Sequence, residues 1–229
     1  MFNSLKSLVF AIILCLICSI LLTTASSGLQ RFQERNIIVD KRKNILKSVG
    51  LINNDQSYPS QKIDQLYTEY IRPRWVDADG RLVNENERGE HSLPVYIYTK
   101  DNKLESYIIP INSRGLWGRI LGYLALEKDG STVAGFTVYK HSETPGLGGE
   151  IEKQWFQKNW VGKKITDQEG DFVSVSIAKG AVDNTIPPNK RRNYVDGISG
   201  ATLTGKYLSS GIKKTLEEYE PVSIKFRQK

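Results

Sequence analysis

The chain contains the stretch Asp196-Gly197-Ile198-Ser199-Gly200-Ala201-Thr202-Leu203-Thr204, and the predicted fold is built outward from it. Its two glycines permit a tight turn that residues with a Cβ atom resist. Apolar residues then recur at helical spacing and predict an amphipathic helix from Leu203 onward, through Tyr207, Leu208, Ile212, Leu216 and Tyr219. The first N–H groups of a helix lack internal partners and attract anions. The residues alone leave two interpretations open, a phosphate-binding turn and a helix capped by a Ser or Thr side chain.

A second stretch, His141-Ser142-Glu143-Thr144-Pro145-Gly146-Leu147-Gly148, follows a predicted strand. Two glycines and a proline make a rigid loop that lets the backbone approach a ligand closely. The pair of His141 and Glu143 invites a general-base interpretation. We favour a structural or supporting role for His141, because the other histidine of the chain, His91, is distant in sequence and no catalytic triad order emerges.

Residues 196–202 read Asp-Gly-x-Ser-Gly-Ala-Thr and resemble the flavinylation motif of a family of FMN-binding domains. The family includes the C subunit of the sodium-translocating NADH:quinone reductase and the G subunit of the related Rnf electron-transport complex. Residues 143–148 match the family's Glu-Thr-Pro-Gly-Leu-Gly loop at all six positions, and residues 115–117 resemble its Gly-Leu-Trp stretch. Two separate motifs in the family's order make the resemblance specific.

The resemblance implies one FMN per chain, joined through its phosphate to the hydroxyl of Thr202 by a flavin transferase. It also implies the surroundings of the flavin: Ser199, Gly200, Ala201 and Leu203 at the attachment point, Glu143 and Thr144 hydrogen-bonded to the flavin edge, Gly146 and Leu147 against a ring face, and Trp117 either beside the flavin or in a core or interface. No catalytic residue and no metal site is expected in this chain.

The implied protein is an electron-carrying subunit of a membrane complex that oxidises NADH, reduces quinone and pumps sodium. Its partners would be the other subunits of that complex. NADH would bind elsewhere, because no Gly-x-Gly-x-x-Gly follows a strand here. The Gly-Leu-Trp stretch and the Ser-Gly-Ala-Thr-Leu-Thr ending favour the sodium pump over the Rnf complex. A membrane-anchored binding module without a redox role is the third hypothesis.

Composition fits one folded domain with an accessory segment: 229 residues, 25% charged and 39% hydrophobic. The net charge of +7 is scattered, and no zinc-finger or RNA-binding signature accompanies it, so no nucleic-acid partner is expected. Both cysteines, Cys15 and Cys18, lie in the N-terminal apolar segment. The rest of the chain lacks cysteine, which fits an oxidising compartment.

That N-terminal segment carries no charge between Lys6 and Arg31, so it is long enough to cross a bilayer as a helix. We favour a retained anchor over residues 1–28, while a signal peptide cleaved near residues 23–27 is the alternative. Lysines and arginines after the span predict a cytoplasmic body. The family places the body on the periplasmic side of the bacterial inner membrane, and we follow the family.

Residues 29–229 are predicted to form an α+β domain, a mostly antiparallel sheet with packed helices, whose FMN-binding region covers about 115–219. The other predicted helices are 29–50, with Phe32, Ile37, Val39, Ile45, Leu46 and Val49 on the buried side and Gly50 as the stop; 61–71, with Ile63, Leu66, Tyr67 and Tyr70 inward and Pro73 as the close; and 150–159, with Trp155 and Phe156 buried. The predicted strands are 93–99, 104–109, 120–126, 132–139 and 172–177.

Turns are predicted at 77–80, at Asp101-Asn102 and at Asp129-Gly130. The Asp-rich start of the first of these lacks the later ligands of a calcium loop, so we interpret it as a surface turn. The run Lys190-Arg191-Arg192 falls in a predicted loop, either as solvated charge or as a cation that offsets the flavin phosphate.

Overall fold

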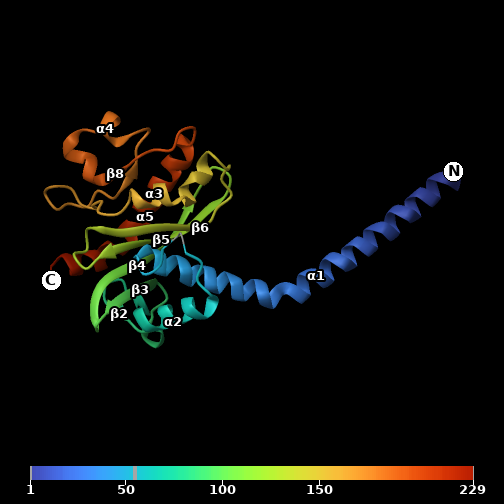
Figure 1. Ribbon diagram of the computed structural model, residues 1–229, viewed down its shortest axis with the longest axis horizontal. Coiled ribbons are helices and arrows are strands. Elements are labelled where there is room, and N and C mark those ends of the chain that lie inside the picture. The colour runs from blue at the N-terminus through green and yellow to red at the C-terminus, as the bar shows by residue number, and fades with distance from the viewer. Residues whose placement is uncertain (1, 54–55, 229) are drawn as a thin grey trace. The chain divides into compact units, whose positions relative to one another are not determined.

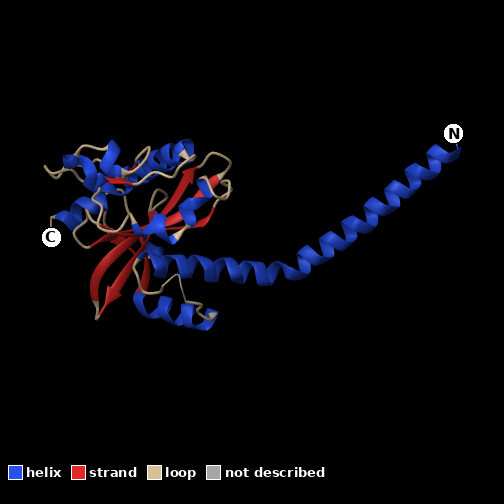
Figure 2. Cartoon of the chain, turned by 45° about the horizontal axis from the view of Figure 1, so that its top comes forward, coloured by secondary structure: helices blue, strands red, loops and turns tan. Residues whose placement is uncertain are grey.

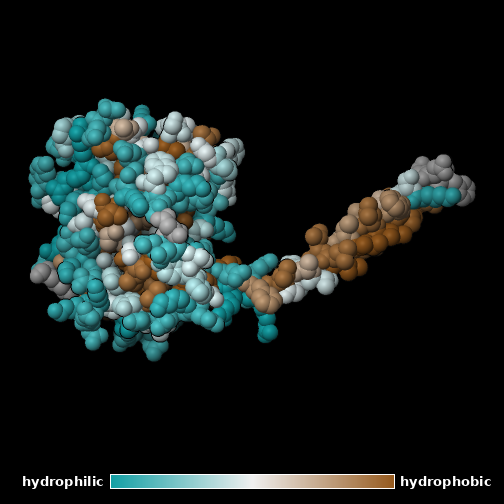
Figure 3. Space-filling model, in the orientation of Figure 1, coloured by the Kyte–Doolittle hydropathy of each residue, from teal (hydrophilic) through white to brown (hydrophobic). Residues whose placement is uncertain are grey.

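The computed structural model describes residues 2–53 and 56–228, and the chain divides into two units, 1–40 and 41–229. The first unit is most of the helix α1 (Phe2–Ser48), drawn in blue in Figure 1. Among the described residues this is the one helix long and apolar enough to cross a membrane. Its apolar part is the brown run of Figure 3. A single helix of this kind near the N-terminus agrees with the prediction.

Helix α1 runs unbroken through residue 28, so the predicted anchor and the predicted helix 29–50 form one element. Phe32 and Ile37 are 67% and 55% exposed, which makes their predicted burial wrong, because full burial on this helix begins only at Asn44. Ile45 and Leu46 are buried as predicted.

The predicted stop at Gly50 is confirmed. Gly50 has φ +71°, and the N–H groups of Gly50 and Leu51 donate to the carbonyls of Lys47 and Leu46, both at 3.0 Å. This is a Schellman ending, which needs a residue that adopts the left-handed conformation without cost.

The second unit contains a six-stranded antiparallel sheet in the order β2-β1-β3-β4-β5-β6, shown in red in Figure 2. Hairpins at Asp101-Asn102, where both residues have positive φ, and at Asp129-Gly130 join its strands as predicted. The strands are β1 (Ile71–Val76), β2 (Leu82–Val83), β3 (Leu93–Lys100), β4 (Lys103–Arg114), β5 (Arg119–Glu127) and β6 (Val133–Lys140). The mostly antiparallel α+β class is therefore confirmed.

Side chains alternate between the two faces of this sheet. On β4, Tyr107 and Ile109 belong to the main core with helix α5 (Thr202–Arg227), and the Tyr107 hydroxyl donates to Ser223 of α5 at 2.8 Å. Ile108 between them is also fully buried, on the opposite face. Helix α2 (Ser60–Tyr70) contacts β1 and β3, and the end of α1 receives a hydrogen bond from Thr137 of β6. Helices thus cover the sheet on both faces.

Two predicted helix details are corrected. Helix α2 ends at Tyr70, one residue before the predicted end. Pro73 lies inside β1, and the helix ends before it as predicted, because the residue before a proline favours extended backbone. A 3₁₀ helix, η2 (Gly148–Glu152), occupies the start of the predicted helix 150–159, so α3 is only Gln154–Lys158. In that position Phe156 is buried, but Trp155 is 46% exposed.

The predicted strand 172–177 is reduced to β7 (Ser176–Ile177), which pairs in parallel with β8 (Tyr194–Val195). Ser174 has φ +73°, and this left-handed residue interrupts the extended backbone before β7. The remaining short elements are η1 (Glu85–Glu87), α4 (Val182–Thr185) and η3 (Pro188–Asn193). Lys190-Arg191-Arg192 therefore lies in a 3₁₀ helix and not in an irregular loop.

Asp129, in the β5–β6 turn, accepts hydrogen bonds from the N–H groups of Ser131 and Thr132 at 2.9 and 2.7 Å and from Lys164 at 3.0 Å. Burial alone raises the pKa of Asp129, but the bonds from Thr132, Ser131 and Lys164 outweigh it and lower that pKa from 3.8 to about 2. A carboxyl whose pKa is lowered by folding stabilises the fold above its ordinary pKa, and this contribution is lost as the pH falls through the folded value.

We therefore expect Asp129→Asn to lower the free energy of unfolding by about 1 kcal/mol at neutral pH. The difference between variant and parent should shrink as the pH falls from 3.8 to about 2, because the parent carboxyl is then protonated as well. Urea unfolding of the detergent-solubilised chain at neutral pH and at about pH 2 measures this. An equal difference between variant and parent at the two pH values would contradict the assignment.

Candidate functional site

The glycine-rich stretch forms the start of α5. Thr202 is the first helical residue, and Ala201 occupies the N-cap position without a side-chain cap hydrogen bond. The alternative of a Ser or Thr side-chain cap is therefore wrong. Gly200 has φ +73°, which turns the chain sharply into the helix. The Thr202 side chain is exposed on this uncapped first turn.

The first two residues of the motif, Asp196 and Gly197, have a structural role. Oδ1 of Asp196 accepts the N–H of Val182 at 2.7 Å, and the Gly197 N–H donates to the Gly180 carbonyl at 2.9 Å. A Cβ on Gly197 would lie 2.2 Å from the Ala178 carbonyl oxygen, so a larger residue cannot fit there. Asp196 and Gly197 thus fix the turn to the segment before α4.

The structure brings this turn against the loop 143–148. A Cβ on Gly200 would lie 2.7 Å from Cδ2 of Leu147, and one on Gly148 would lie 2.6 Å from Oγ1 of Thr204. Gly148 is therefore required by the close approach of the two stretches, and Gly200 is required by its left-handed backbone. The two motifs, which are about fifty residues apart in sequence, are walls of one site.

Glu143 joins a third stretch to these two. Its carboxyl group is buried, with the residue only 5% exposed. Oε1 accepts the backbone N–H of Trp117 at 3.0 Å, and Oε2 accepts the Thr204 hydroxyl at 2.5 Å. Both oxygens thus bond to the protein itself and hold the Gly115–Gly118 hairpin and the start of α5 to the loop. Thr204 was not predicted as a site residue.

The spacing of Thr202 and Thr204 explains why one hydroxyl is exposed and the other is buried. Residues two apart in a helix point roughly 200° apart, so Thr202 and Thr204 face opposite sides of α5. Thr202 is exposed, whereas Thr204 is 2% exposed. The Thr-x-Thr pattern at the helix start was the available signal for a second, inward hydroxyl.

Each of the three stretches keeps an apolar side chain exposed. Trp117 is 69% exposed, so the alternative of a core tryptophan is wrong. Leu147 and Leu203, at 43% and 49%, are exposed as well, together with the polar Ser199 and Thr144. Gly146 has φ +74° and open space where a Cβ would stand, and Ala201 is buried beneath the turn. The exposed apolar residues Trp117, Leu147 and Leu203 thus come one from each stretch.

His141 braces the loop. Its Nδ1 accepts the N–H of Glu143 at 3.1 Å, and its Nε2 lies 3.2 Å from Oε2 of Glu152. The acceptor role of Nδ1 places the proton on Nε2, which donates to Glu152. Both ring nitrogens are used within the fold, as expected of a supporting residue.

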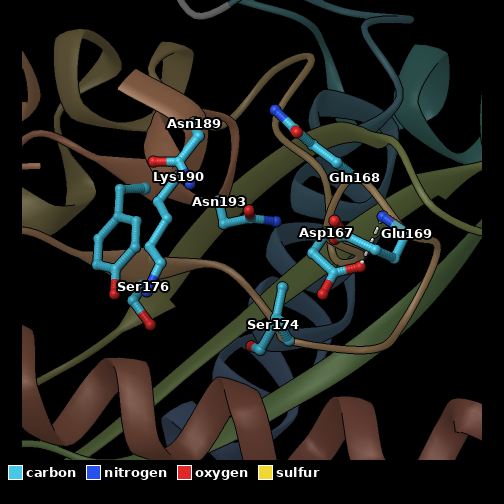
Figure 4. A pocket seen from close by; sticks show the side chains of 10 residues that line it. Asp167, Gln168, Glu169, Ser174, Ser176, Asn189, Lys190 and Asn193 are labelled. Carbon is cyan, nitrogen blue, oxygen red and sulfur yellow. Dashed lines mark hydrogen bonds between the residues drawn. The ribbon is translucent and has the colours of Figure 1, made fainter. Parts of the chain in front are cut away.

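A separate polar pocket of about 310 Å³ is shown in Figure 4. In it Oδ1 of Asp167 accepts the N–H of Glu169 at 3.1 Å, and Lys190 and Asn193 line it from η3. None of its lining residues belongs to the three stretches described above. Arg191 is engaged by Asp183 at 2.9 Å, so that part of the cationic run is tied within its own segment. Within residues 2–53 and 56–228, no group of acids, histidines and cysteines could hold a metal ion.

Glu143→Ala leaves two donors without their acceptor, and we expect it to lower the free energy of unfolding by about 2–3 kcal/mol. Thr204→Val should cost about 1–3 kcal/mol, and the double variant should cost clearly less than the sum, because both changes break the same bond. Thermal and urea unfolding of flavin-free chains measures this. Thr202→Val is the matched control and should stay within about 0.5 kcal/mol of the parent. Additive losses would contradict the Glu143–Thr204 bond.

Comparison with known proteins bears on the same residues. A family model described as FMN-binding domain matches residues 115–217. This range includes all three stretches of the site. A crystal structure of the C subunit of Na(+)-translocating NADH-quinone reductase from Parabacteroides distasonis superposes with a TM-score of 0.71 at 31% identity, covering 85% of this chain and 96% of that one.

Curated relatives extend the similarity to the N-terminal helix. The C subunit of the Na(+)-translocating NADH-quinone reductase of Vibrio parahaemolyticus is 33% identical, with 93% of this chain and 88% of the relative covered. The protein of the same name from Pseudomonas aeruginosa is 32% identical, with 88% and 87% covered. The chain belongs to the family formed by the C subunits of the Na(+)-translocating NADH-quinone reductase.

Proposed function

We propose that this chain is the FMN-carrying electron-transfer subunit of a sodium-translocating NADH–quinone reductase, with FMN joined through its phosphate to Oγ1 of Thr202. Relatives from this reductase at about 30% identity over most of the chain support the electron-transfer role. The observation that carries the attachment is the exposed Thr202 hydroxyl on an uncapped helix start, beside exposed apolar side chains.

The residues present fit the cofactor. A phosphate at Thr202 lies at the positive end of the α5 dipole, where first-turn N–H groups lack a side-chain cap. Gly200 turns the chain into the helix, and Ser199 is exposed as a hydrogen-bond donor. Leu147, Leu203 and Trp117 would supply apolar surface for the ring system.

Glu143 is assigned a different role from the one that the resemblance implies. Because its oxygens bond Trp117 and Thr204, it positions the walls of the site instead of bonding the flavin edge. Thr144, which is exposed, is the side chain of that loop that is available to the flavin edge.

When bound, FMN supplies the capacity to accept and donate electrons, and the chain holds and orients it. A phosphoester prevents its loss in a compartment without a replacement pool. We propose that a flavin transferase forms this bond and that the other subunits of the complex supply and take the electrons. NADH oxidation and sodium movement then belong to those subunits.

We further propose that α1 is retained as a single-pass anchor in the bacterial inner membrane, with the domain on the periplasmic side. The apolar part of the helix supports a span. The absence of cysteine after Cys18 supports an oxidising compartment. The Lys and Arg residues that follow the span favour the opposite orientation, so the orientation needs a direct experiment.

We expect Thr202→Ala, co-expressed with a flavin transferase, to lose all covalent flavin, because the acceptor oxygen is gone. Thr204→Val is the matched control and should keep it, since that hydroxyl is buried. The measurement is flavin fluorescence of the denatured polypeptide, with mass spectrometry of the tryptic peptide 193–206. An unmodified peptide from native membranes, or flavin on Thr204, would overturn the proposal.

For the orientation, Asn102 in the exposed β3–β4 turn is replaced by Cys in a chain whose Cys15 and Cys18 are replaced by Ala. A membrane-impermeant maleimide should label it once the outer membrane is permeabilised. Labelling only after the inner membrane is broken would place the domain in the cytoplasm.

A further inference from the structure

Strand β4 has an open edge immediately before the Gly115–Gly118 hairpin. Its partner on one side, β5, pairs with it as far as Arg114↔Arg119, and the Gly115 N–H donates to the Gly118 carbonyl. Bonded and non-bonded pairs alternate along an antiparallel ladder. Counting back from the bonded pair of Gly115 and Gly118, the backbone groups of Asn112 and Arg114 point away from β5, toward the side of β3.

Strand β3 does not reach these groups. The pairing of β3 with β4 begins at Tyr96↔Ile108, and in the same register Pro94 stands opposite Pro110. Neither proline has an N–H, so this pair exchanges no ladder bond. Before Pro94 the chain turns away, since the Ser92 N–H donates to the Gly89 carbonyl at 3.2 Å. The two prolines end the ladder and leave the last residues of β4 as an edge.

A groove of about 660 Å³ runs along this edge, between β4 and the exposed side of α5. Strand β4 and helix α5 meet closely at its floor, because the Ser113 hydroxyl lies 3.0 Å from the carbonyl oxygens of both Arg114 and Tyr207. A Cβ on Gly211 would lie 2.0 Å from Ser113 Oγ. The groove includes Arg114, the residue directly before the hairpin that carries Trp117. It therefore adjoins the flavin site without sharing the attachment motif.

The charged residues of the groove favour an acidic occupant. Arg114 and Lys214 line it, and Glu218 is its one acidic residue among the described lining. The Arg114 guanidinium lies 5.5 Å from the Tyr207 ring centroid, which holds it over the groove. Arg119 adds a third cation at the rim, where it donates to Asn112 Oδ1 at 2.8 Å.

We propose that this edge and groove, the β4 edge groove, dock an extended acidic segment of a partner polypeptide by strand addition. The segment hydrogen-bonds the outward N–H and carbonyl of Asn112 and the outward N–H of Arg114, whose carbonyl already faces the Ser113 hydroxyl at 3.0 Å. It places its carboxylates against Arg114 and Lys214. Docking there brings the partner beside the flavin, where an electron donor or acceptor is needed. The inference rests on the proposed function only in taking the partner from the same membrane complex.

Asn112→Pro is the sharp test, because it removes an outward N–H at an edge position that tolerates proline. Asn112→Ala is its matched control, since it keeps the N–H. The charge test is Arg114→Glu with Lys214→Glu, controlled by Lys158→Glu with Lys179→Glu, an equal charge change at exposed lysines elsewhere. Each full chain is co-expressed with the other subunits, and the chain retained per complex after detergent extraction is measured.

We expect Asn112→Pro to lower retention about threefold to tenfold relative to Asn112→Ala. The Arg114/Lys214 pair should lower it at least tenfold at low salt, with less effect at high salt. All variants should keep the thermal stability of the parent and covalent flavin in the denatured chain. These measurements test the docking proposal separately from the proposed flavin attachment. Absence of covalent flavin from the parent chain would overturn the attachment and leave the docking proposal standing.

Equal retention of the Pro and Ala variants, or of the two charge pairs, would overturn the proposal. So would disulfide-linked homodimers through Asn112→Cys in native membranes, because they would make a second copy the occupant. Protection of the Asn112 amide from hydrogen exchange in the complex, and its exposure in the isolated chain, would support strand addition.

Discussion

The carboxyl group of Glu143 lies where three stretches that are far apart in the sequence meet. Burial of such a group is costly unless its oxygens are hydrogen-bonded. Here one oxygen is bonded by the backbone of the Gly115–Gly118 hairpin and the other by a side chain at the start of α5. The need for partners in the interior therefore positions the hairpin, the loop and the helix relative to one another. Gly115 and Gly148 lack side chains because these stretches meet so closely around Glu143.

The sheet supports this junction from below. Strands β4 and β5 bring the hairpin to one end of the sheet, and β6 leads directly into the loop that holds Glu143. Helix α5 packs its buried side on the same strands, so its first turn arrives at the same end. The site is built where three connections of a rigid scaffold converge, which is a common location for ligand binding.

Much of the fold was predictable from local sequence patterns. The hairpins at Asp101-Asn102 and Asp129-Gly130, the stop at Gly50 and the buried stripe of α5 follow from turn chemistry and helical periodicity, and all are present. Patterns failed where tertiary contacts decide. The exposure of Trp155 depends on η2, which delays α3, and the short β7 depends on the left-handed Ser174. Both are backbone choices that composition does not reveal.

In the site, too, local sequence patterns were predictable and tertiary contacts were not. Its two motifs were recognisable from their residues, and their mutual contact through Leu147 and Gly200 agrees with that prediction. The inward role of Glu143 and its bond to Thr204 were not predicted, because the partner of a carboxyl group depends on which residues the fold places next to it. Likewise, Pro94 and Pro110 are unremarkable in sequence, and only the strand register sets them opposite each other.

The buried hydroxyl of Thr204 has a consequence for maturation. An unfolded chain offers Ser199, Thr202 and Thr204 within six residues of one another as equivalent nucleophiles. The folded chain withdraws Thr204 and leaves Thr202 on the surface. Ser199 stays exposed as well, so folding removes one of the three hydroxyls of the motif and leaves two accessible. Under the proposed attachment, a transferase that distinguishes Thr202 from Thr204 by exposure would act only on chains whose α5 start has already folded onto Glu143.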